Sequence, residues 1–366
     1  MPSHPDGLTI VNPWSTQVGN LDRCRHYFRL LKKGYCGTYP AVDYFPQMES
    51  LLQAVEEGNF LIWLAYIDNQ IIGTSSIEIQ DGIASLVSSV NVERKVNIGI
   101  LLYKRIIDLL EWNESIWAID GEIRLTRNIE IAGTQIESGV KSQHINLKCG
   151  LKPYLFCYPK YSMKGRLRGK RQFLLFARKL FEPAIFDPVV FTPFPPNNRV
   201  GIAEILNLSC KINNEIAPTF SHDVAQTAND QSGYVHICRN GHPQFATAYL
   251  SGALTLDRIA GVVRQELEAV DYLELVTLNS PSNLYIQEAF YSLHAIPIGV
   301  LPNNLFWKGP KEKLYGTTIH FGLLKNTNKN TFLPVDFCNE LSFASSKETM
   351  YRLMQEWKKN ESSFEY

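Results

Sequence analysis

The segment from Ser85 to Leu110 constrains the fold more than any other part of the chain, because an apolar strand passes through a basic turn directly into an amphipathic helix. The turn reads Arg94-Lys95-Val96-Asn97-Ile98-Gly99. Such a turn directs several backbone N–H groups to one point, and the helix N-terminus adds the positive end of its dipole. Gly99 permits a close approach that a Cβ would obstruct. The junction therefore predicts a binding site for a pyrophosphate group.

The segments around this junction predict a mixed α/β architecture. Upstream, Phe60 to Ile67 and Gln70 to Ile79 have the composition of two strands, joined by the polar turn Asp68-Asn69. Downstream we expect a strand, a short helix from Gly139 to Lys148, and a further strand. The predicted order is helix, helix, hairpin, strand, turn, helix, strand, helix, strand.

This order and this turn resemble the GNAT superfamily, the acyl-CoA-dependent N-acyltransferases. The signature turn of that family is Arg or Gln, two residues, Gly, one residue, then Gly or Ala. Arg94 and Gly99 match it, while Asn97 replaces the first Gly. Asn tolerates left-handed backbone geometry better than most residues, so this departure is mild. The resemblance covers residues 8 to 178.

The resemblance implies a thioester donor, with acyl-CoA as the predicted cofactor, an acyl carrier protein thioester as the alternative, and no metal. In the family, the thioester carbonyl accepts a hydrogen bond from backbone N–H on the strand before the turn, here near Val90 or Val92. The implied donor-binding residues are Val90, Val92, Arg94, Lys95, Val96, Asn97, Ile98, Gly99 and Ile100.

Acyl transfer to an amine also needs a base for the ammonium proton and an acid for the departing thiolate. Glu78 shares a strand face with Ser76 and is one candidate base, with an ordinary solvent-facing residue as the alternative. His144 is the second candidate, with a capping or core histidine as the alternative. The resemblance implies a tyrosine as the acid. Tyr154 and Tyr158 are available, and we assign Tyr154.

The chain also predicts a tandem organisation. Residues 181 to 200 are rich in Pro and Phe, which indicates a linker, and residues 201 to 325 again resemble a GNAT domain. Only five residues separate Leu250 from Leu256, too few for a second phosphate turn. We expect this half either to complete the pocket of the first half or to act as structural support.

The predicted fold class is α/β (α+β), with two tandem GNAT-like domains, each a mixed, mostly antiparallel sheet flanked by helices. The predicted divisions are residues 1–180 for the domain with the donor turn, 181–200 for the linker, 201–325 for a degenerate GNAT-like domain and 326–366 for a C-terminal extension with a helix.

Composition restricts the partners. The chain has 366 residues, 45% of them hydrophobic, and a formal net charge of zero, which suits two cores and disfavours nucleic acid as a partner. No apolar run is long enough to span a bilayer. Seven cysteines without metal-type spacing predict reduced thiols in a cytoplasmic protein. The basic segment 160–171 predicts a solvated loop or, alternatively, a docking surface for an acidic carrier protein or leader peptide.

A tandem arrangement with one silent half resembles the maturation enzymes that fatty-acylate Lys or ornithine side chains of ribosomal peptides. We therefore predict an acyltransferase that moves an acyl group, long-chain by preference, from a thioester to a primary amine, with a precursor peptide as acceptor. An acetyltransferase acting on a free amino acid or another small amine is one alternative, and a non-catalytic acyl-CoA sensor is another. The sequence leaves both monomer and dimer open.

Overall fold

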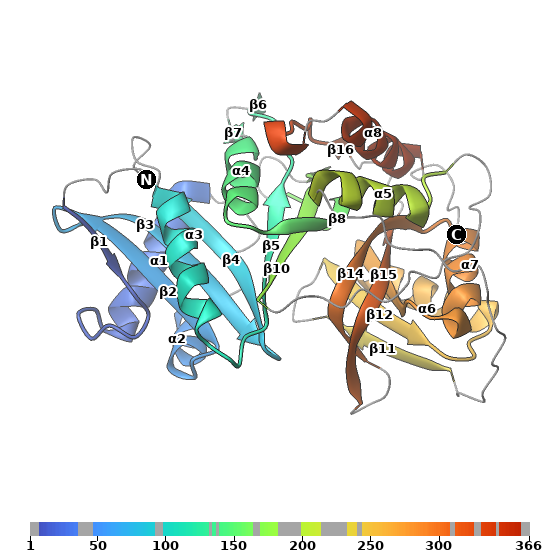
Figure 1. The fold of residues 1–366 in the computed structure, drawn as a ribbon, viewed down its shortest axis with the longest axis horizontal. Helices are drawn as coiled ribbons and strands as arrows, with labels where there is room; N and C mark the ends of the chain where they lie inside the picture. Colours follow the sequence, from blue (N-terminus) through green and yellow to red (C-terminus); the bar gives the residue numbers. More distant parts are fainter. Residues whose placement is uncertain are drawn as a thin grey trace.

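The computed structural model describes residues 7–35, 47–91, 98–131, 134–136, 139–163, 169–181, 199–213, 233–239, 244–307, 312–325, 331–341 and 344–359. They form a twelve-stranded sheet flanked by helices (Figure 1). Neighbouring strands in this sheet are antiparallel except for β4–β5 and β12–β13, which are parallel. The predicted fold class, a mixed, mostly antiparallel sheet with flanking helices, is confirmed.

The first half of the chain contains the predicted helices and strands in the predicted order, with β1, β6, β7, β9 and β10 in addition, and the predicted turn, up to Asn97, lies outside the described residues. Its elements are β1 (Leu8–Val11), α1 (Asn20–Tyr35), α2 (Met48–Glu56), β2 (Phe60–Ile67), β3 (Gln70–Gln80), β4 (Ile83–Asn91), α3 (Ile98–Glu111), β5 (Ala118–Arg124), β6 (Ile129–Ile131), β7 (Thr134–Ile136), α4 (Val140–Lys148), β8 (Lys152–Tyr158), β9 (Lys170–Arg171) and β10 (Leu174–Leu180).

The second half continues the same sheet. Its elements are α5 (Ile202–Asn213), β11 (Tyr234–Cys238), β12 (Phe245–Ser251), α6 (Leu256–Ala269), β13 (Tyr272–Leu278), the 3-10 turn η3 (Pro281–Asn283), α7 (Leu284–Ser292), β14 (Ile296–Trp307), β15 (Lys313–Leu324), β16 (Thr331–Phe332), η4 (Asn339–Leu341) and α8 (Ala344–Lys359). We predicted a strand only from Ile298 to Leu301, but β14 continues to Trp307 because a bulge at Pro302 and Asn303 absorbs the proline.

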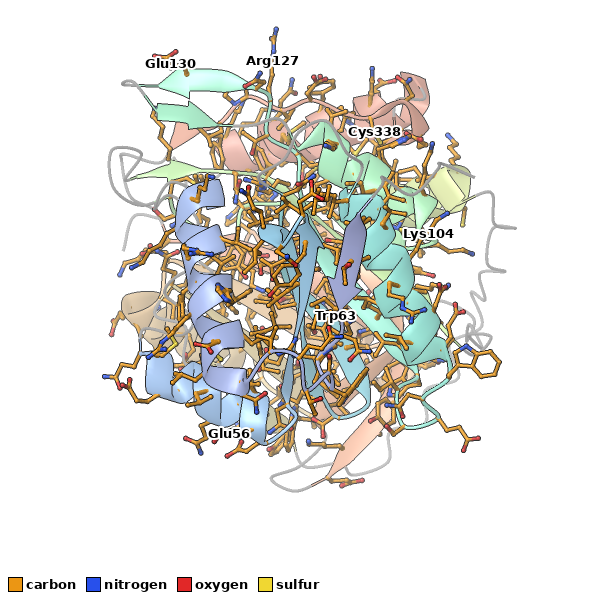
Figure 2. The ribbon with its side chains drawn as sticks, turned by 90° about the vertical axis from the view of Figure 1, so that its left-hand side faces the viewer. Glu56, Trp63, Lys104, Arg127, Glu130 and Cys338 are labelled. Atoms are coloured by element: carbon orange, nitrogen blue, oxygen red, sulfur yellow. The ribbon has the colours of Figure 1, made fainter. Side chains whose placement is uncertain are left out.

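Strand β2 is apolar on both faces, and helices cover both. On β2, Phe60, Ile62 and Leu64 pack in a core with α1 and α2, whereas Leu61 and Trp63 pack in a core with α3. Figure 2 shows α1 and α3 on opposite sides of the strands, with Trp63 between them. The unbroken apolar run of this strand is therefore explained by two-sided burial.

The strand order is mirrored about the junction of β8 and β14 over four strands on each side. The full order is β1-β2-β3-β4-β5-β10-β8-β14-β15-β13-β12-β11, so the series β4-β5-β10-β8 meets the series β14-β15-β13-β12 in reverse. Each series contains one parallel pair, and the strands of that pair are separated in the chain by one helix, α3 or α6. The same supersecondary order thus occurs twice, and the two copies meet edge to edge.

The two halves meet at a close approach of β8 and β14, where Leu155 pairs with Gly299. A Cβ built on Gly299 would lie 2.1 Å from the carbonyl oxygen of Tyr154 and 2.8 Å from the Cα of Leu155. The backbones can pair here only because position 299 lacks a side chain. Helices α5 and α8 both pack against these two strands.

A buried arginine joins the halves beside this pair. Arg178 on β10 is 2% exposed and binds Asp120 on β5 through Nε at 2.6 Å and Nη2 at 2.8 Å. Its Nη1 donates to the carbonyls of Pro302 at 3.1 Å and Asn303 at 3.3 Å, within the bulge of β14. The guanidinium therefore links the first half to the irregular part of the second half.

The predicted linker, residues 181–200, lies outside the described residues except for Phe181, Arg199 and Val200. The solvated-loop prediction for segment 160–171 is wrong at both ends: the Lys160 ammonium lies 2.8 Å from Glu122, and Arg171 is 2% exposed and lies 3.3 Å from Asp271. Over the part of the chain that is described, no helix is both long and apolar enough to cross a bilayer.

We expect Gly299→Ala to destabilise the protein by about 1–3 kcal/mol, the usual range for overpacking a filled site. The reason is that the new methyl group would collide with backbone atoms of β8, which cannot move as a side chain can. The control is Gly316→Ala on β15, where the nearest atom to the added Cβ is 3.4 Å away. Urea unfolding followed by circular dichroism measures both, and equal effects would contradict the junction argument.

We expect Asp120→Ala to cost about 3–5 kcal/mol of unfolding free energy, because it leaves the Arg178 charge buried without its carboxylate. Arg352→Met on α8 is the matched control. It removes a pair with Glu204 whose side chains are 42% and 38% exposed, and such a pair contributes at most about 1 kcal/mol. A loss at Asp120 no larger than that of the control would show that the buried pair does not hold the halves together.

Candidate functional site

The parallel strands β4 and β5 separate along their length. They pair at four positions, from Ile83 with Ala118 to Leu86 with Gly121. Beyond Leu86, β4 continues to Asn91 and β5 continues to Arg124 without further pairing between them. Each strand remains bonded on its other side, β4 to β3 and β5 to β10. A wedge-shaped opening therefore interrupts the sheet beside α3.

This opening contains a cavity of about 160 Å³, which we call the split cavity. Its walls come from both separated strands and from the first turns of α3 and α4. They include Ser88, Ser89 and Asn91 of β4, Gly99 and Tyr103 of α3, Gly121, Glu122 and Arg124 of β5, and Lys141, Ser142 and Ile145 of α4. Backbone groups of β4 that do not pair with β5 can bind an extended ligand that contains amides, as an added strand would.

Gly99 brings the start of α3 to the wall of this cavity. The nearest atom to a Cβ built there is the Cδ1 of Ile145, at 3.1 Å, so the position is crowded on the α4 side. Ile98 is completely buried and fixes the start of the helix in the core. The N-terminal N–H groups of a helix lack intrahelical partners and favour an anion. The helix start and the cation Lys141 thus meet at one cavity.

A buried amide lies next to the split cavity. Asn146 on α4 is 2% exposed, and its Nδ2 donates to the carbonyl of Ser142 at 2.8 Å. Its Oδ1 has no hydrogen-bond partner among the described residues and would lie 3.1 Å from a Cβ at Gly121. A buried acceptor without a partner is costly, so a ligand N–H at this position would be favoured.

The predicted donor residues are only partly described. Val90, Ile98, Gly99 and Ile100 are within the structure, and Gly99 lines the split cavity. Val90 is 5% exposed and packs in the core with α1 and α2. The remaining predicted residues lie outside the described part of the chain: Val92, Arg94, Lys95, Val96 and Asn97.

The structure does not bring the three predicted catalytic residues together. Glu78 on β3 pairs with Phe60 and Ser85 and lines none of the cavities we describe. His144 on α4 places Nδ1 at 2.7 Å from Glu340, at the surface and outside the split cavity. Tyr154 is 4% exposed and lies in the core.

The carboxylate that lines the split cavity is Glu122, which sequence reasoning missed. Its Oε1 accepts from Tyr158 at 3.2 Å and from Lys160 at 2.8 Å, and its Oε2 accepts from Tyr161 at 2.8 Å. Burial, with the charges of Glu122 and Glu274, raises the pKa of Tyr158 well above its usual value. The Tyr158 hydroxyl therefore keeps its proton and remains a donor at neutral pH.

Burial suppresses the reactivity of two cysteines at and near α4. Burial raises the pKa of Cys149, at the end of α4, to about 11, and it does the same for Cys338. A thiol with a raised pKa is mostly protonated at neutral pH and reacts slowly. Among the described residues, no group of three or more His, Cys, Asp and Glu side chains has the geometry to hold a metal ion.

Comparison with known proteins gives only distant likenesses. No family model and no curated protein sequence matches the chain. A spermidine N-acetyltransferase from Vibrio cholerae in complex with CoA and spermine superposes with a TM-score of 0.35 and 13% identity, over 48% of this chain and 95% of that one. An N-acetyltransferase from Staphylococcus aureus Mu50 gives 0.34 and 11%, over 48% and 97%. A putative acetyltransferase from Acinetobacter baylyi ADP1 gives 0.36 and 16%, over 47% and 92%.

Proposed function

We propose that the chain is an acyltransferase of the GNAT type, which moves an acyl group from a coenzyme A thioester to a primary amine. One observation carries this proposal: the parallel pair β4–β5 opens into a cavity that meets the start of α3 at Gly99. In this arrangement the pantetheine arm would lie between the separated strands, beside the part of β4 that does not pair with β5. The pyrophosphate would lie at the helix start.

In the transfer, the nitrogen loses two protons and the sulfur gains one. A base takes the ammonium proton, the neutral amine attacks the thioester carbonyl, a C–N bond forms, and the C–S bond breaks. The nitrogen loses its second proton as the amide forms, an acid protonates the leaving thiolate, and one proton is released overall. Glu78, His144 and Tyr154 are the residues assigned to these roles from sequence. The position of Glu122 at the split cavity makes it the competing base, with Tyr158 as the acid beside it.

We further propose that the two halves are tandem copies, with divisions at residues 1–180, 181–200, 201–325 and 326–366. The mirrored strand order supports this. The two parallel pairs differ, however, in how far they stay paired. Strands β12 and β13 pair at six consecutive positions, from Phe245 with Tyr272 to Leu250 with Thr277, and so leave no opening. The second half would then lack a donor site of its own.

The finer assignments are also proposals. We infer that the acyl group is long-chain and that the acceptor is a Lys or ornithine side chain of a ribosomally made peptide, and we place the protein in the cytoplasm. An acyl carrier protein thioester is the alternative donor. Acetylation of a free amino acid or small amine, and acyl-CoA sensing without turnover, are the competing functions that the following measurements separate.

We expect CoA thioesters to raise the melting temperature of the wild-type protein and to have no effect on Gly99→Glu. A ligand that binds only the folded state stabilises it, and the added carboxylate would fill the cavity and repel the phosphates. Gly261→Glu is the matched control, since it lies in α6 with no atom within 4 Å of an added Cβ. Differential scanning fluorimetry from acetyl-CoA to palmitoyl-CoA makes the measurement.

The outcomes of that series are distinct. A shift that grows with chain length supports long-chain transfer, and a shift with acetyl-CoA alone supports acetylation. If no CoA thioester shifts the melting temperature, the same measurement is made with an acyl carrier protein thioester. If neither donor shifts it, the proposed donor site is wrong.

Glu122→Gln should lower kcat/KM by about 10²–10⁴-fold, the usual contribution of a positioned base, while the thioester shift persists. Glu78→Gln and His144→Gln, measured in the same thiol-release assay, test the assignments made from sequence. If kcat/KM falls only in the Glu78 or the His144 variant, that residue is the base and Glu122 is not. Binding of the thioester without turnover in the wild type would instead support a sensor.

A further inference from the structure

A second cavity lies where the two halves meet, and we call it the inter-half groove. It has a volume of about 270 Å³ and is lined by strands of both halves. Asp120 and Glu122 of β5 face it, whereas their neighbours Ile119 and Ile123 pack in the core with α3. The groove is therefore on the sheet face opposite α3, and Glu122 lines both it and the split cavity.

We propose that the inter-half groove binds the acceptor as a primary ammonium on an alkyl arm, held between Glu122 of the first half and Glu274 of the second. This inference rests on the proposed function and names where its amine substrate lies. It also gives the second half a specific role, which is to supply one of the two carboxylates.

The first support is the charge balance of the groove. Its lining contains four carboxylates, from Asp81, Asp120, Glu122 and Glu274, and two cations, from Lys160 and Arg178. Asp120 is neutralised by Arg178, and Asp81 is neutralised at the rim by Lys313, at 2.9 Å. Glu122 and Glu274 are left with Lys160 as their one lysine or arginine partner in the lining, so the carboxylates here outnumber the Lys and Arg side chains by one. An added ammonium would make these two counts equal.

The second support is the hydrogen-bonding capacity of the two carboxylates. A carboxylate accepts about four hydrogen bonds. Glu122 accepts three from described residues, and Glu274 accepts one from His320 Nδ1 at 2.7 Å and a long one from Thr247 at 3.4 Å. Both carboxylates therefore have acceptor positions to spare, although their side chains are only 23% and 14% exposed. An ammonium has three N–H donors to fill them.

The state of Glu274 suits this role. Burial alone would raise its pKa, but the hydrogen bond and charge of His320, together with Lys160 and Thr247, hold it below the ordinary value. His320 Nε2 lies 2.7 Å from the hydroxyl of Thr318, which fixes the orientation of the ring. The Glu274 carboxylate is thus ionised at neutral pH.

The chain itself already places an alkylammonium in this groove. The Lys160 ammonium lies 2.8 Å from Glu122 and 4.0 Å from the centre of the Phe245 ring, and its side chain is 15% exposed. Carboxylate and aromatic ring together form a cation-binding environment. The remaining walls include Leu155, Phe176, Tyr249 and Leu301, which can contact the methylenes of an arm.

Isothermal titration calorimetry with Nα-acetyl-lysine N-methylamide tests the groove without any thioester. The norleucine analogue, which lacks only the amino group, is the control ligand. We expect the wild type to bind the lysine probe and not the norleucine probe. Glu274→Gln should weaken binding of the lysine probe at least tenfold, because the ammonium loses one of its two carboxylate partners.

Two further variants keep the test decisive. Glu268→Gln removes an exposed carboxylate of the second half outside the groove and should bind the lysine probe as the wild type does. Leu305→Trp narrows the groove from β14 without changing a charge and should also weaken binding, so a folding defect in Glu274→Gln would not end the test. Equal affinity for the lysine probe in all variants, or equal affinity for both probes in the wild type, would overturn the proposal.

Failure of the proposed function would look different. Lysine-probe binding that depends on Glu274, in a protein that no thioester stabilises, would keep the groove as an amine site and reject acyl transfer. A normal thioester shift with no binding of the lysine probe to the wild type would reject the groove alone. Glu274→Gln should leave the thioester shift unchanged, because Glu274 does not line the split cavity.

Discussion

The ion pair of Arg178 with Asp120 is the interaction on which the arrangement of the two halves depends. A buried guanidinium is tolerated only where carboxylates and carbonyls occupy its donors, and here the carboxylate comes from β5 while the carbonyls come from the bulge of β14. Removing either side would leave a charge in the interior. Arg178 therefore fixes the second half against the first through the β14 carbonyls, beside the close approach of β8 and β14 that Gly299 allows.

The two parallel strand pairs of the sheet differ in how many positions stay paired. Strands β4 and β5 lose contact after four paired positions, and the gap becomes a cavity. Strands β12 and β13 stay paired over six positions, so the backbone groups that would receive a ligand are used within the sheet. Opening a paired ladder in a core without a ligand would leave unsatisfied polar groups. A fully paired β12–β13 ladder is thus the stable arrangement when no ligand lies between these two strands.

Much of this fold follows from local sequence patterns. The strand β4 and the helix α3 that begins at Ile98, the hairpin at Asp68-Asn69 and the helix from Leu256 to Ala269 appear where the sequence pattern predicts them. Contacts between residues distant in sequence could not be predicted in the same way. The meeting of β8 with β14 depends on Gly299 and on bulges in both strands, and neither leaves a periodic signal. Lys160 and Arg171 look like members of a solvated basic run, yet both are bound by carboxylates distant in sequence, Glu122 and Asp271.

The candidate site shows the same limit at the level of single residues. Glu122 lies in the strand Ala-Ile-Asp-Gly-Glu-Ile-Arg, where alternating acids suggest only an exposed face, and its partners Tyr158, Lys160 and Tyr161 come 36 to 39 residues later. Glu274 is equally inconspicuous until β15 brings His320 beside it. Proximity created by sheet order, not spacing in the chain, assembles both carboxylates. Because each half supplies one of them, neither half alone contains the pair, and a search for a catalytic motif within one domain would miss it.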